Sequence, residues 1–247
     1  MTGSKRIEGS VALVTGANRG IGRALTEALL ERGAEKVYAT ARDPKTLDAL
    51  TQQHGPRLVP LRLDVTNTDQ VAEAARQAQD VDLLINNAGR VEPGELTGEA
   101  IVDVARREME VNYFGPLRML QRFADTLAQH GGAIVNVNSG AGLANAPILP
   151  TYSASKAALH SLTQASRALL AARGVAVFGV YAGPVDTDLA KGFDLDTTPP
   201  QDVANGILDG VEAGNEDIFP DPWAVAFAEL FNSSPKDAER QAAAMTA

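Results

Sequence analysis

Short runs rich in Val, Ile and Leu alternate along this chain with longer, Ala-rich amphipathic segments. Strands of a parallel sheet are buried on both faces, so they are continuous apolar runs in the sequence, and a crossover helix joins each to the next. The alternation predicts an α/β fold, a doubly wound, seven-stranded parallel sheet with helices on both faces. We expect strands at residues 11–15, 36–40, 58–63, 81–85, 133–137, 175–181 and 217–219. We expect helices at 21–32, 46–53, 68–79, 99–129, 151–173, 202–213 and 222–231.

No repeat, low-complexity segment or Gly/Ser linker divides the 247 residues. One domain spanning residues 1–247 is therefore predicted. Residues 232–247 are polar and Ala-rich. They are predicted to be a loose C-terminal tail or a helix that orders only against a neighbouring subunit.

The chain is acidic, with 22 Lys and Arg against 31 Asp and Glu and a net charge of −9. This charge repels a polyanionic backbone, so no nucleic acid partner is expected. Cys is absent, which excludes disulfides and thiolate metal sites. The three histidines, His54, His130 and His160, show no ligand spacing, so we predict that they lie on the surface and bind no metal.

The N-terminal sequence MTGSKRIEGS has two basic residues but no apolar run after them. No later window approaches 18 uninterrupted apolar residues. The absence of Cys fits a reducing compartment. We therefore expect a soluble, cytoplasmic protein without a membrane partner.

Residues 11–22, VALVTGANRGIG, are an apolar strand followed by a Gly-rich turn and a helix. Gly16, Gly20 and Gly22 would let the backbone turn sharply and approach a pyrophosphate, whose charge the helix N-terminus favours. The spacing Gly-x-x-x-Gly-x-Gly meets the general dinucleotide fingerprint only in part. The alternative is an ordinary strand-to-helix turn that contains glycines.

Arg42 ends the second predicted strand, where doubly wound folds select between a ribose 2′-hydroxyl and a 2′-phosphate. Guanidinium groups from Arg42 and Arg19 would pair with the phosphate, so the sequence favours NADP(H) over NAD(H). Asp43 argues mildly for NAD(H), but Asp43 followed by Pro44 also fits a helix N-cap and first turn. The alternative for Arg42 is a solvated loop arginine.

The third and fourth predicted strands also end in polar residues, at the edge where ligands of doubly wound sheets bind. Asp64 could accept a hydrogen bond from adenine, with the Val65 amide beside it, or could cap the next helix. The NNAG turn at 86–89 contains Asn87, Ala88 and Gly89 as further candidates. Paired asparagines are also common in turns that bind nothing.

Ser139, Tyr152 and Lys156 bring a hydroxyl, a phenol and an amine close together in the sequence. Lys156 follows Tyr152 by four residues, so a helix that begins near Thr151 places both on one face. An ammonium group, an oxidised nicotinamide and a helix N-terminus all favour phenolate, and together would lower the pKa of Tyr152 from its ordinary value of about 10. Each residue alone fits an ordinary loop or packing role.

Several motifs occur in one order along the chain, namely TGANRGIG at 15–22, NNAG at 86–89, Asn112, Ser139, Tyr152 with Lys156, and GPVDT at 183–187. Together they resemble the short-chain dehydrogenase/reductase family in its short, NADP(H)-dependent form. The resemblance spans residues 11–219. It implies a Rossmann fold and an oxidoreductase that transfers a hydride between NADP(H) and a carbonyl or secondary alcohol. The chain departs from the family at Ala182, where proline is usual, and at Asn138, where serine is usual.

The resemblance also implies roles for the catalytic candidates. Tyr152 would be the general acid in reduction and the base in oxidation. Ser139 would donate a hydrogen bond to the carbonyl oxygen, and Lys156 would tune the phenol and hold the nicotinamide ribose. Asn112 would order a water that leads to Lys156. The Gly-Pro pair at 115–116 is expected to kink the helix and disturb the backbone bonding around Asn112.

A dinucleotide is expected to contact residues from every strand end. The cofactor-binding candidates are Gly16, Asn18, Arg19, Gly20, Ile21, Gly22, Arg42, Asp64, Val65, Asn87, Ala88, Gly89, Tyr152, Lys156, Gly183, Val185 and Thr187. By the resemblance, Val185 would offer its backbone to the nicotinamide carboxamide and Thr187 its hydroxyl.

The resemblance places the substrate beside the segments after NNAG, before Tyr152 and after Thr187. The substrate candidates are Arg90, Leu143, Ile148, Leu149 and Phe193. The four apolar side chains would form a wall that favours aromatic or aliphatic ketones and aldehydes. Arg90 and Lys191 could instead receive an anion.

By the same resemblance, the chain would form a homo-tetramer or homo-dimer through the helices at 99–129 and 151–173. The alternatives to a carbonyl reductase are a 3-oxoacyl thioester reductase of lipid or polyketide synthesis and a non-catalytic NADP(H) sensor. The intact group of Ser139, Tyr152 and Lys156 argues against the sensor, because a sensor does not need a tuned phenol.

Overall fold

The computed structural model describes residues 3–188 and 196–244. Its strands are β1 (Val11–Val14), β2 (Lys36–Ala41), β3 (Leu58–Arg62), β4 (Leu83–Asn86), β5 (Ala133–Ser139), β6 (Ala176–Ala182) and β7 (Asp217–Ile218). They form a parallel sheet in the order β3-β2-β1-β4-β5-β6-β7. The order reverses between β1 and β4, which is where doubly wound folds bind ligands. The predicted doubly wound, seven-stranded parallel sheet is confirmed.

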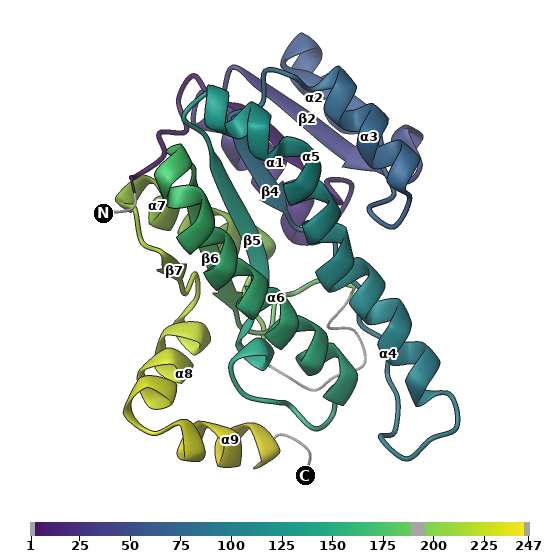
Figure 1. Cartoon of the computed structure of the whole chain (residues 1–247), viewed down its shortest axis with the longest axis vertical. Coiled ribbons are helices and arrows are strands. Elements are labelled where there is room, and N and C mark those ends of the chain that lie inside the picture. The colour runs from purple at the N-terminus through teal and green to yellow at the C-terminus, as the bar shows by residue number, and fades with distance from the viewer. Residues whose placement is uncertain (1–2, 189–195, 245–247) are drawn as a thin grey trace.

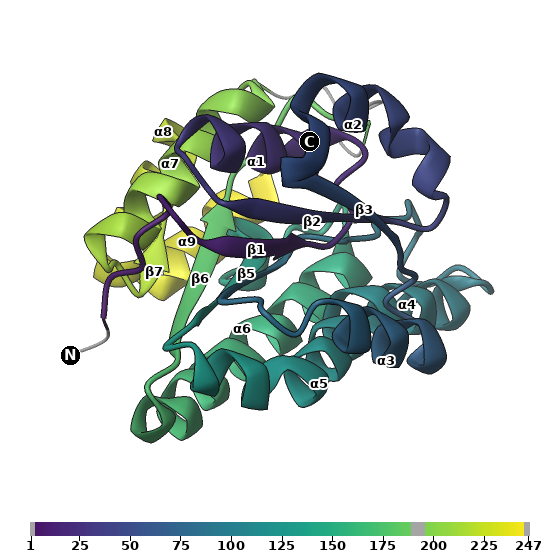
Figure 2. The ribbon, with the colours of Figure 1, turned by 90° about the horizontal axis from the view of Figure 1, so that it is seen from above.

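Helices cover both faces of this sheet. They are α1 (Gly20–Glu31), α2 (Asp48–His54), α3 (Thr68–Gln77), α4 (Ile101–Met109), α5 (Gly115–Gln129), α6 (Pro150–Leu170), α7 (Pro200–Ala213), α8 (Pro222–Ser233) and α9 (Pro235–Ala244). In Figure 2, α1, α2 and α7 lie on one side of the strands, and α3, α5 and α6 lie on the other. The sheet therefore buries both of its faces, as continuous apolar strands require.

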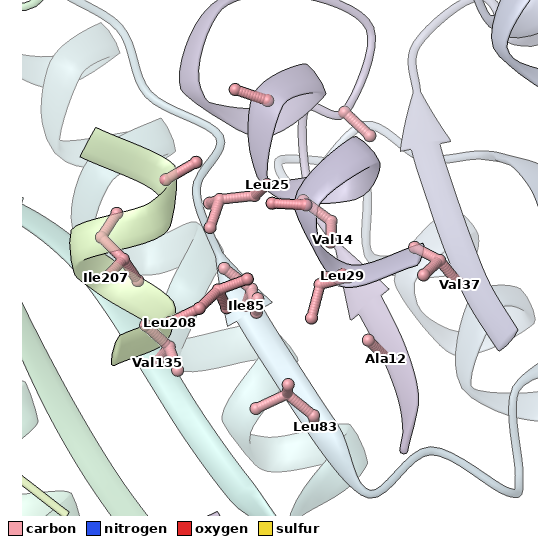
Figure 3. Close-up of a cluster of buried hydrophobic side chains, with 14 of the residues drawn as sticks. Ala12, Val14, Leu25, Leu29, Val37, Leu83, Ile85, Val135, Ile207 and Leu208 are labelled. Carbon is pink, nitrogen blue, oxygen red and sulfur yellow. The ribbon is translucent and has the colours of Figure 1, made fainter. Parts of the chain in front are cut away.

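An aliphatic cluster joins α1 and α7 to the sheet (Figure 3). Leu25 and Leu29 from α1 and Ile207 and Leu208 from α7 share this cluster with Ile85 of β4, and all five side chains are fully buried. Burial of each such side chain contributes roughly 1.5–3 kcal/mol. The packing fixes the start of α1 at the carboxyl ends of β1 and β4.

The helix predicted at 99–129 is interrupted by a π-helical turn, η3 (Glu110–Phe114), between α4 and α5. Asn112 lies inside this turn and is fully buried. Pro116 follows and has no N–H to donate to the preceding turn, which is a physical reason for the irregular bonding. The expected disturbance around Asn112 is confirmed.

The segment predicted as a loose C-terminal tail is helical in this structure. Ala238 and Ala242 of α9 are buried. The Ser234 hydroxyl accepts a hydrogen bond from the backbone N of Asp237 at 3.3 Å, so the Ser-Pro start of α9 is a capped helix start. Figure 1 shows α8 and α9 beyond the ends of β5 and β6, on the side of the molecule where the sheet carries its loops. Residues 235–244 of the predicted tail are therefore helical, and the contribution of a neighbouring subunit to their order stays a prediction.

Candidate active site

A cavity of about 900 Å³ lies at the carboxyl ends of the central strands. The turns that follow β1 to β6 line it, together with residues of α8 and α9. This volume is near the upper end for small-molecule sites, and the position is the one where open α/β sheets bind ligands.

Glycine geometry shapes the turn between β1 and α1. Gly16 and Gly20 have φ angles of 67° and 53°, which other residues rarely adopt. Gly22 packs so closely that an added Cβ would meet the carbonyl oxygen of Gly16 at 2.2 Å. Asn87 closes the turn, because its Nδ2 donates to the carbonyl oxygens of Thr15 and Gly16 at 2.9 and 3.2 Å. The turn therefore has no room for side chains at its glycines.

The first turn of α1 is suited to an anion. Arg19 occupies the N-cap without a side-chain capping bond, and no acidic residue lies in the first turn. By contrast, Asn67 caps α3 and Asp221 caps α8. Unbonded N–H groups and the helix dipole together favour a phosphate at such an uncapped end. The neighbouring cavity-lining residues are Gly16, Asn18, Gly20 and Ile21.

Arg42 and Arg19 both line the cavity but differ in their partners. Arg19 forms an ion pair with Asp188 at 2.8 Å. In the part of the chain that the structure describes, Arg42 has no hydrogen-bond or ion-pair partner. The carboxylate of Asp43 accepts a hydrogen bond from the backbone N of Lys45 at 3.1 Å and so caps the following 3₁₀ turn. Of these two arginines, Arg42 is therefore the one whose guanidinium is available to a ligand, and Asp43 is engaged by the backbone.

Asp64 and Val65 line the cavity at the end of β3. Oδ1 of Asp64 accepts hydrogen bonds from the backbone N and the hydroxyl of Thr66 at 3.0 and 2.7 Å. The alternative that Asp64 caps α3 is wrong, because Asn67 accepts the first-turn N–H groups of that helix. The contact with adenine stays a prediction.

The NNAG turn after β4 is tied to β1. The Thr15 hydroxyl accepts hydrogen bonds from the backbone N of Asn87 at 2.9 Å and of Ala88 at 3.0 Å. Asn87, Ala88 and Gly89 line the cavity. Asn86 does not line it and bonds instead to Asn136 inside the sheet, at 2.9 Å. The structure therefore brings the three predicted residues of this turn to the phosphate turn.

Ser139, Tyr152 and Lys156 meet on one wall of the cavity. Ser139 ends β5 and shares a hydrogen bond with the phenol of Tyr152. On α6, the Nζ atom of Lys156 lies 5.7 Å from the centroid of the Tyr152 ring. The same Nζ donates to the carbonyl oxygen of Val137 at 2.8 Å. The phenol and the amine share one helix face, as their spacing predicts.

Burial changes the proton affinity of both groups. It raises the pKa of Tyr152 to about 12, while the hydrogen bond with Ser139 opposes this rise and the charge of Glu108 adds to it. Burial lowers the pKa of Lys156 to about 8. In the structure, desolvation of the phenolate outweighs its stabilisation by Ser139, so the pKa is raised; the lowering expected together with the oxidised nicotinamide stays a prediction.

The side-chain amide of Asn112 forms hydrogen bonds with protein partners. Its Oδ1 accepts from the backbone N of Arg90, and its Nδ2 donates to the carbonyl oxygen of Arg90 and the hydroxyl of Ser155, each at 2.8 Å. The side chain therefore fixes the loop that follows NNAG beside α6. Its role in ordering a water stays a prediction.

A carboxylate braces the turn after β6. Asp221 accepts hydrogen bonds from the backbone N of Gly183 and of Ala224, both at 2.8 Å. The Thr187 hydroxyl donates to the carbonyl oxygen of Val185 at 3.3 Å. Gly183, Val185 and Thr187 all line the cavity. The brace from α8 holds this turn, although it lacks the proline that is usual in the family.

The structure separates the four apolar substrate candidates. Ile148 and Leu149 line the cavity. Leu143 is not among the residues that line the cavity; its backbone N bonds to the carbonyl of Gly140 after a 3₁₀ turn, and its contact with substrate stays a prediction. Phe193 lies outside the described residues. The predicted apolar wall is therefore present in part.

Arg90 lines the cavity, but its charge is compensated. It forms an ion pair with Glu92, which also pairs with Arg107 at 2.9 Å. Hydrogen bonds from Arg107 and Arg90 lower the pKa of Glu92 to about 2. The backbone N of Glu92 donates to Oε1 of the fully buried Glu108 at 2.9 Å. This network weakens the interpretation of Arg90 as an anion receptor. Lys191, the other candidate for an anion, lies outside the residues that the structure describes.

Sequence reasoning missed the contribution of α8 and α9 to the cavity. Trp223, Phe227 and Ala242 are lining residues. The two rings are stacked, with centroids 4.8 Å apart and planes at 11°. A signal was available, because the one tryptophan of the chain and a phenylalanine four residues later fall on one face of the predicted helix.

Two of the three histidines do not lie on the surface as predicted. The Nδ1 atom of His160 lies 2.6 Å from the Tyr181 hydroxyl, and burial lowers the pKa of this half-buried histidine. The Nε2 atom of His54 is buried without a hydrogen-bond partner among the described residues. Across 3–188 and 196–244, no cluster of His, Asp and Glu could hold a metal ion, and no helix is long and apolar enough to cross a membrane.

Known proteins share this architecture. A family model described as short chain dehydrogenase matches residues 10–197. An uncharacterized oxidoreductase of Staphylococcus aureus is 35% identical over 208 residues, which cover 80% of this chain and 89% of that protein. A short chain dehydrogenase from Burkholderia cenocepacia, solved in complex with NADP, has a TM-score of 0.91 at 39% identity, covering 96% of this chain and 99% of that one. A short chain dehydrogenase/reductase from Burkholderia phymatum, solved with NAD, has a TM-score of 0.82 at 25% identity, covering 94% and 96%.

Proposed function

Because the chain belongs to the short-chain dehydrogenase family, we propose that it transfers a hydride between NADP(H) and a carbonyl or secondary alcohol substrate. One observation carries the proposal: Ser139, Tyr152 and Lys156 meet in the cavity that also contains the glycine turn. A glycine turn alone would fit many nucleotides, and the polar group alone would fit an ordinary helix start. Their presence in one cavity fits a bound dinucleotide beside a proton donor.

The phosphate end of the cavity supports NADP(H) as the cofactor. The uncapped start of α1 suits a pyrophosphate, and the unpaired guanidinium of Arg42 suits a 2′-phosphate. Asp43 does not oppose this assignment, because its carboxylate caps a backbone turn. The two Burkholderia relatives were solved with NADP and with NAD, so both cofactors occur among similar chains. We assign the preference of this chain for NADP(H) over NAD(H) to Arg42.

NADP(H), when bound, supplies or accepts the hydride. Tyr152 gives a proton to the carbonyl oxygen, and its pKa of about 12 keeps the phenol protonated at neutral pH. Ser139 donates a hydrogen bond to the same oxygen as negative charge develops there. Lys156, with a pKa of about 8, is mostly an ammonium at neutral pH and stabilises the phenolate that remains. The protonated phenol is the form that serves reduction, whereas oxidation requires Tyr152 to lose its proton first.

Oxidation of NADPH and NADH with a panel of ketones, aldehydes and acyl thioesters tests the proposal. We expect turnover with NADPH and a carbonyl, and a loss of at least about a hundredfold in Tyr152→Phe with NADPH binding retained by calorimetry. Tyr113→Phe is the matched control, because Tyr113 is not among the residues that line the cavity. Unchanged turnover in Tyr152→Phe would contradict the mechanism. Turnover of acyl thioesters alone would favour a thioester reductase, and NADPH binding without turnover would favour a sensor.

We also propose a homo-tetramer or homo-dimer in the cytoplasm, with contacts through α4, α5 and α6. Leu169 on α6 is 75% exposed and Phe114 in the π-helical turn is 41% exposed. Large exposed apolar side chains are common at protein interfaces. Sedimentation of a monomer alone would contradict this assembly.

A further inference from the structure

Trp223 occupies the space between the ends of β5 and β6. A Cβ added to Gly140, the residue after Ser139, would meet Cζ3 of Trp223 at 2.6 Å. A Cβ added to Gly183, in the turn after β6, would meet Cε3 of Trp223 at 2.8 Å. The two glycines thus leave room for one indole ring, which lies next to the residue that shares a hydrogen bond with Tyr152.

Two residues of the same segment fix this ring. Phe227 stacks on Trp223 and is only 3% exposed. Asp221 is equally buried and joins the backbone N of Gly183 to the backbone N of Ala224. The hydrogen bonds of Asp221 therefore join the turn after β6 to the start of α8, and stacking on Phe227 holds the indole beside them. The position of Trp223 is set before any ligand arrives.

The segment 141–149 adds small and aliphatic side chains to this end. From the segment 141–149, the cavity-lining residues are Ala141, Ala144, Ala146, Ile148 and Leu149. The cation of the adjoining loop, Arg90, is ion-paired with Glu92. A substrate whose carbonyl reaches Tyr152 therefore meets a flat aromatic ring and aliphatic side chains. These groups suit an uncharged, planar substrate.

We propose that Trp223 determines substrate specificity by stacking on the ring of an aryl ketone or aryl aldehyde whose carbonyl lies at Ser139 and Tyr152. The inference rests on the proposed function and names its substrate class. A carbonyl carbon bonded directly to an aryl ring brings the ring within reach of Trp223, because Gly140 beneath the indole adjoins Ser139. Aromatic pairs gain free energy beyond that of buried area, corresponding to about a tenfold preference.

Acetophenone and cyclohexyl methyl ketone are a matched pair of probes, because they share one carbon skeleton, and their intrinsic difference in carbonyl reactivity cancels when variants are compared. The ratio of their kcat/KM values is expected to fall about tenfold in Trp223→Leu relative to the native chain, and to be largely kept in Trp223→Phe. Val225→Ala changes an exposed residue of the same helix and is expected to leave the ratio unchanged. An unchanged ratio in Trp223→Leu would overturn the proposal.

A second readout needs no turnover. The chain has one tryptophan, so nitrogen-15 spectra contain a single indole N–H resonance. With NADP⁺ present, acetophenone is expected to shift this resonance saturably through its ring current, and cyclohexyl methyl ketone to shift it much less. A saturable shift without NADPH oxidation would support the aryl site and refute the proposed function. Oxidation of NADPH with acetophenone and an unmoved indole resonance would refute the role of Trp223 alone.

Discussion

The two ends of the cavity are built from different parts of the polypeptide. At the cofactor end the shape comes from backbone, with glycines at positive φ and an uncapped helix start beside β1. At the substrate end the shape comes from side chains of segments far apart in the sequence, such as Ile148 and Trp223. Backbone near a glycine cannot yield to an added atom, whereas side chains can repack. The cofactor end should therefore tolerate little change, and the substrate end should accept variation without loss of the fold.

The largest effect is expected at Gly22. Gly22→Ala should lower the free energy of unfolding by about 3 kcal/mol and abolish measurable NADPH binding, because the new Cβ meets the Gly16 oxygen at 2.2 Å. Gly140→Ala at the substrate end meets side-chain atoms of Trp223 and Phe227 rather than backbone, so its cost should be smaller, about 1 kcal/mol. Chemical denaturation and calorimetry measure both. Equal losses of unfolding free energy in Gly22→Ala and Gly140→Ala would contradict the difference between the two ends of the cavity.

Arg42 offers the next largest effect. Arg42→Ala should weaken NADPH binding by about 10- to 100-fold and leave NADH binding unchanged, because a charge-assisted contact with the 2′-phosphate is lost. Arg19→Ala should cost less, because that guanidinium already pairs with Asp188. Titration calorimetry with both cofactors measures the difference. Equal weakening of NADPH and NADH in Arg42→Ala would rule out a 2′-phosphate contact.

Leu149 tests the wall at the substrate end. Leu149→Ala should raise KM for an apolar ketone by up to about tenfold and leave NADPH affinity unchanged, because only the substrate loses apolar contact. Leu143→Ala is the control, since Leu143 does not line the cavity. Steady-state kinetics measure KM for both variants. A larger rise in KM for Leu143→Ala would mean that the wall lies elsewhere.

The smallest effect is expected at Glu108, a fully buried carboxylate that does not line the cavity. Its charge adds to the rise of the Tyr152 pKa, after the larger effect of burial. Alcohol oxidation needs the phenolate, so its rate should increase as the pH rises toward this pKa. Glu108→Gln removes the charge, lowers the Tyr152 pKa and should move that increase to lower pH. Asp103→Asn, an exposed change on the same helix, is the control for these pH–rate profiles, and a shift to higher pH in Glu108→Gln would exclude the electrostatic role.

The difference between the two ends of the cavity also explains which features of the fold and the site can be predicted from the sequence. The sheet, the glycine turn and the spacing of Tyr152 and Lys156 depend on neighbours along the chain, so periodicity and motifs predict them. The place of Trp223 depends on where α8 packs, and the exclusion of Leu143 depends on one local turn. The raised pKa of Tyr152 depends on burial by the whole fold. Local patterns contain too little information about such packing.

The π-helical turn at Glu110–Phe114 makes the length of this segment more important than its composition. An α-helix turns by about 100° per residue, so the additional residue of a π-helical turn rotates the side chains of α4 about the helix axis relative to those of α5. With that rotation, Glu108 before the turn and Phe123 after it are both fully buried. Loss of a single codon here would turn α4 about its axis, carry Glu108 toward solvent and expose the loop that it supports. A one-residue deletion in this segment should therefore be more damaging than most substitutions within it.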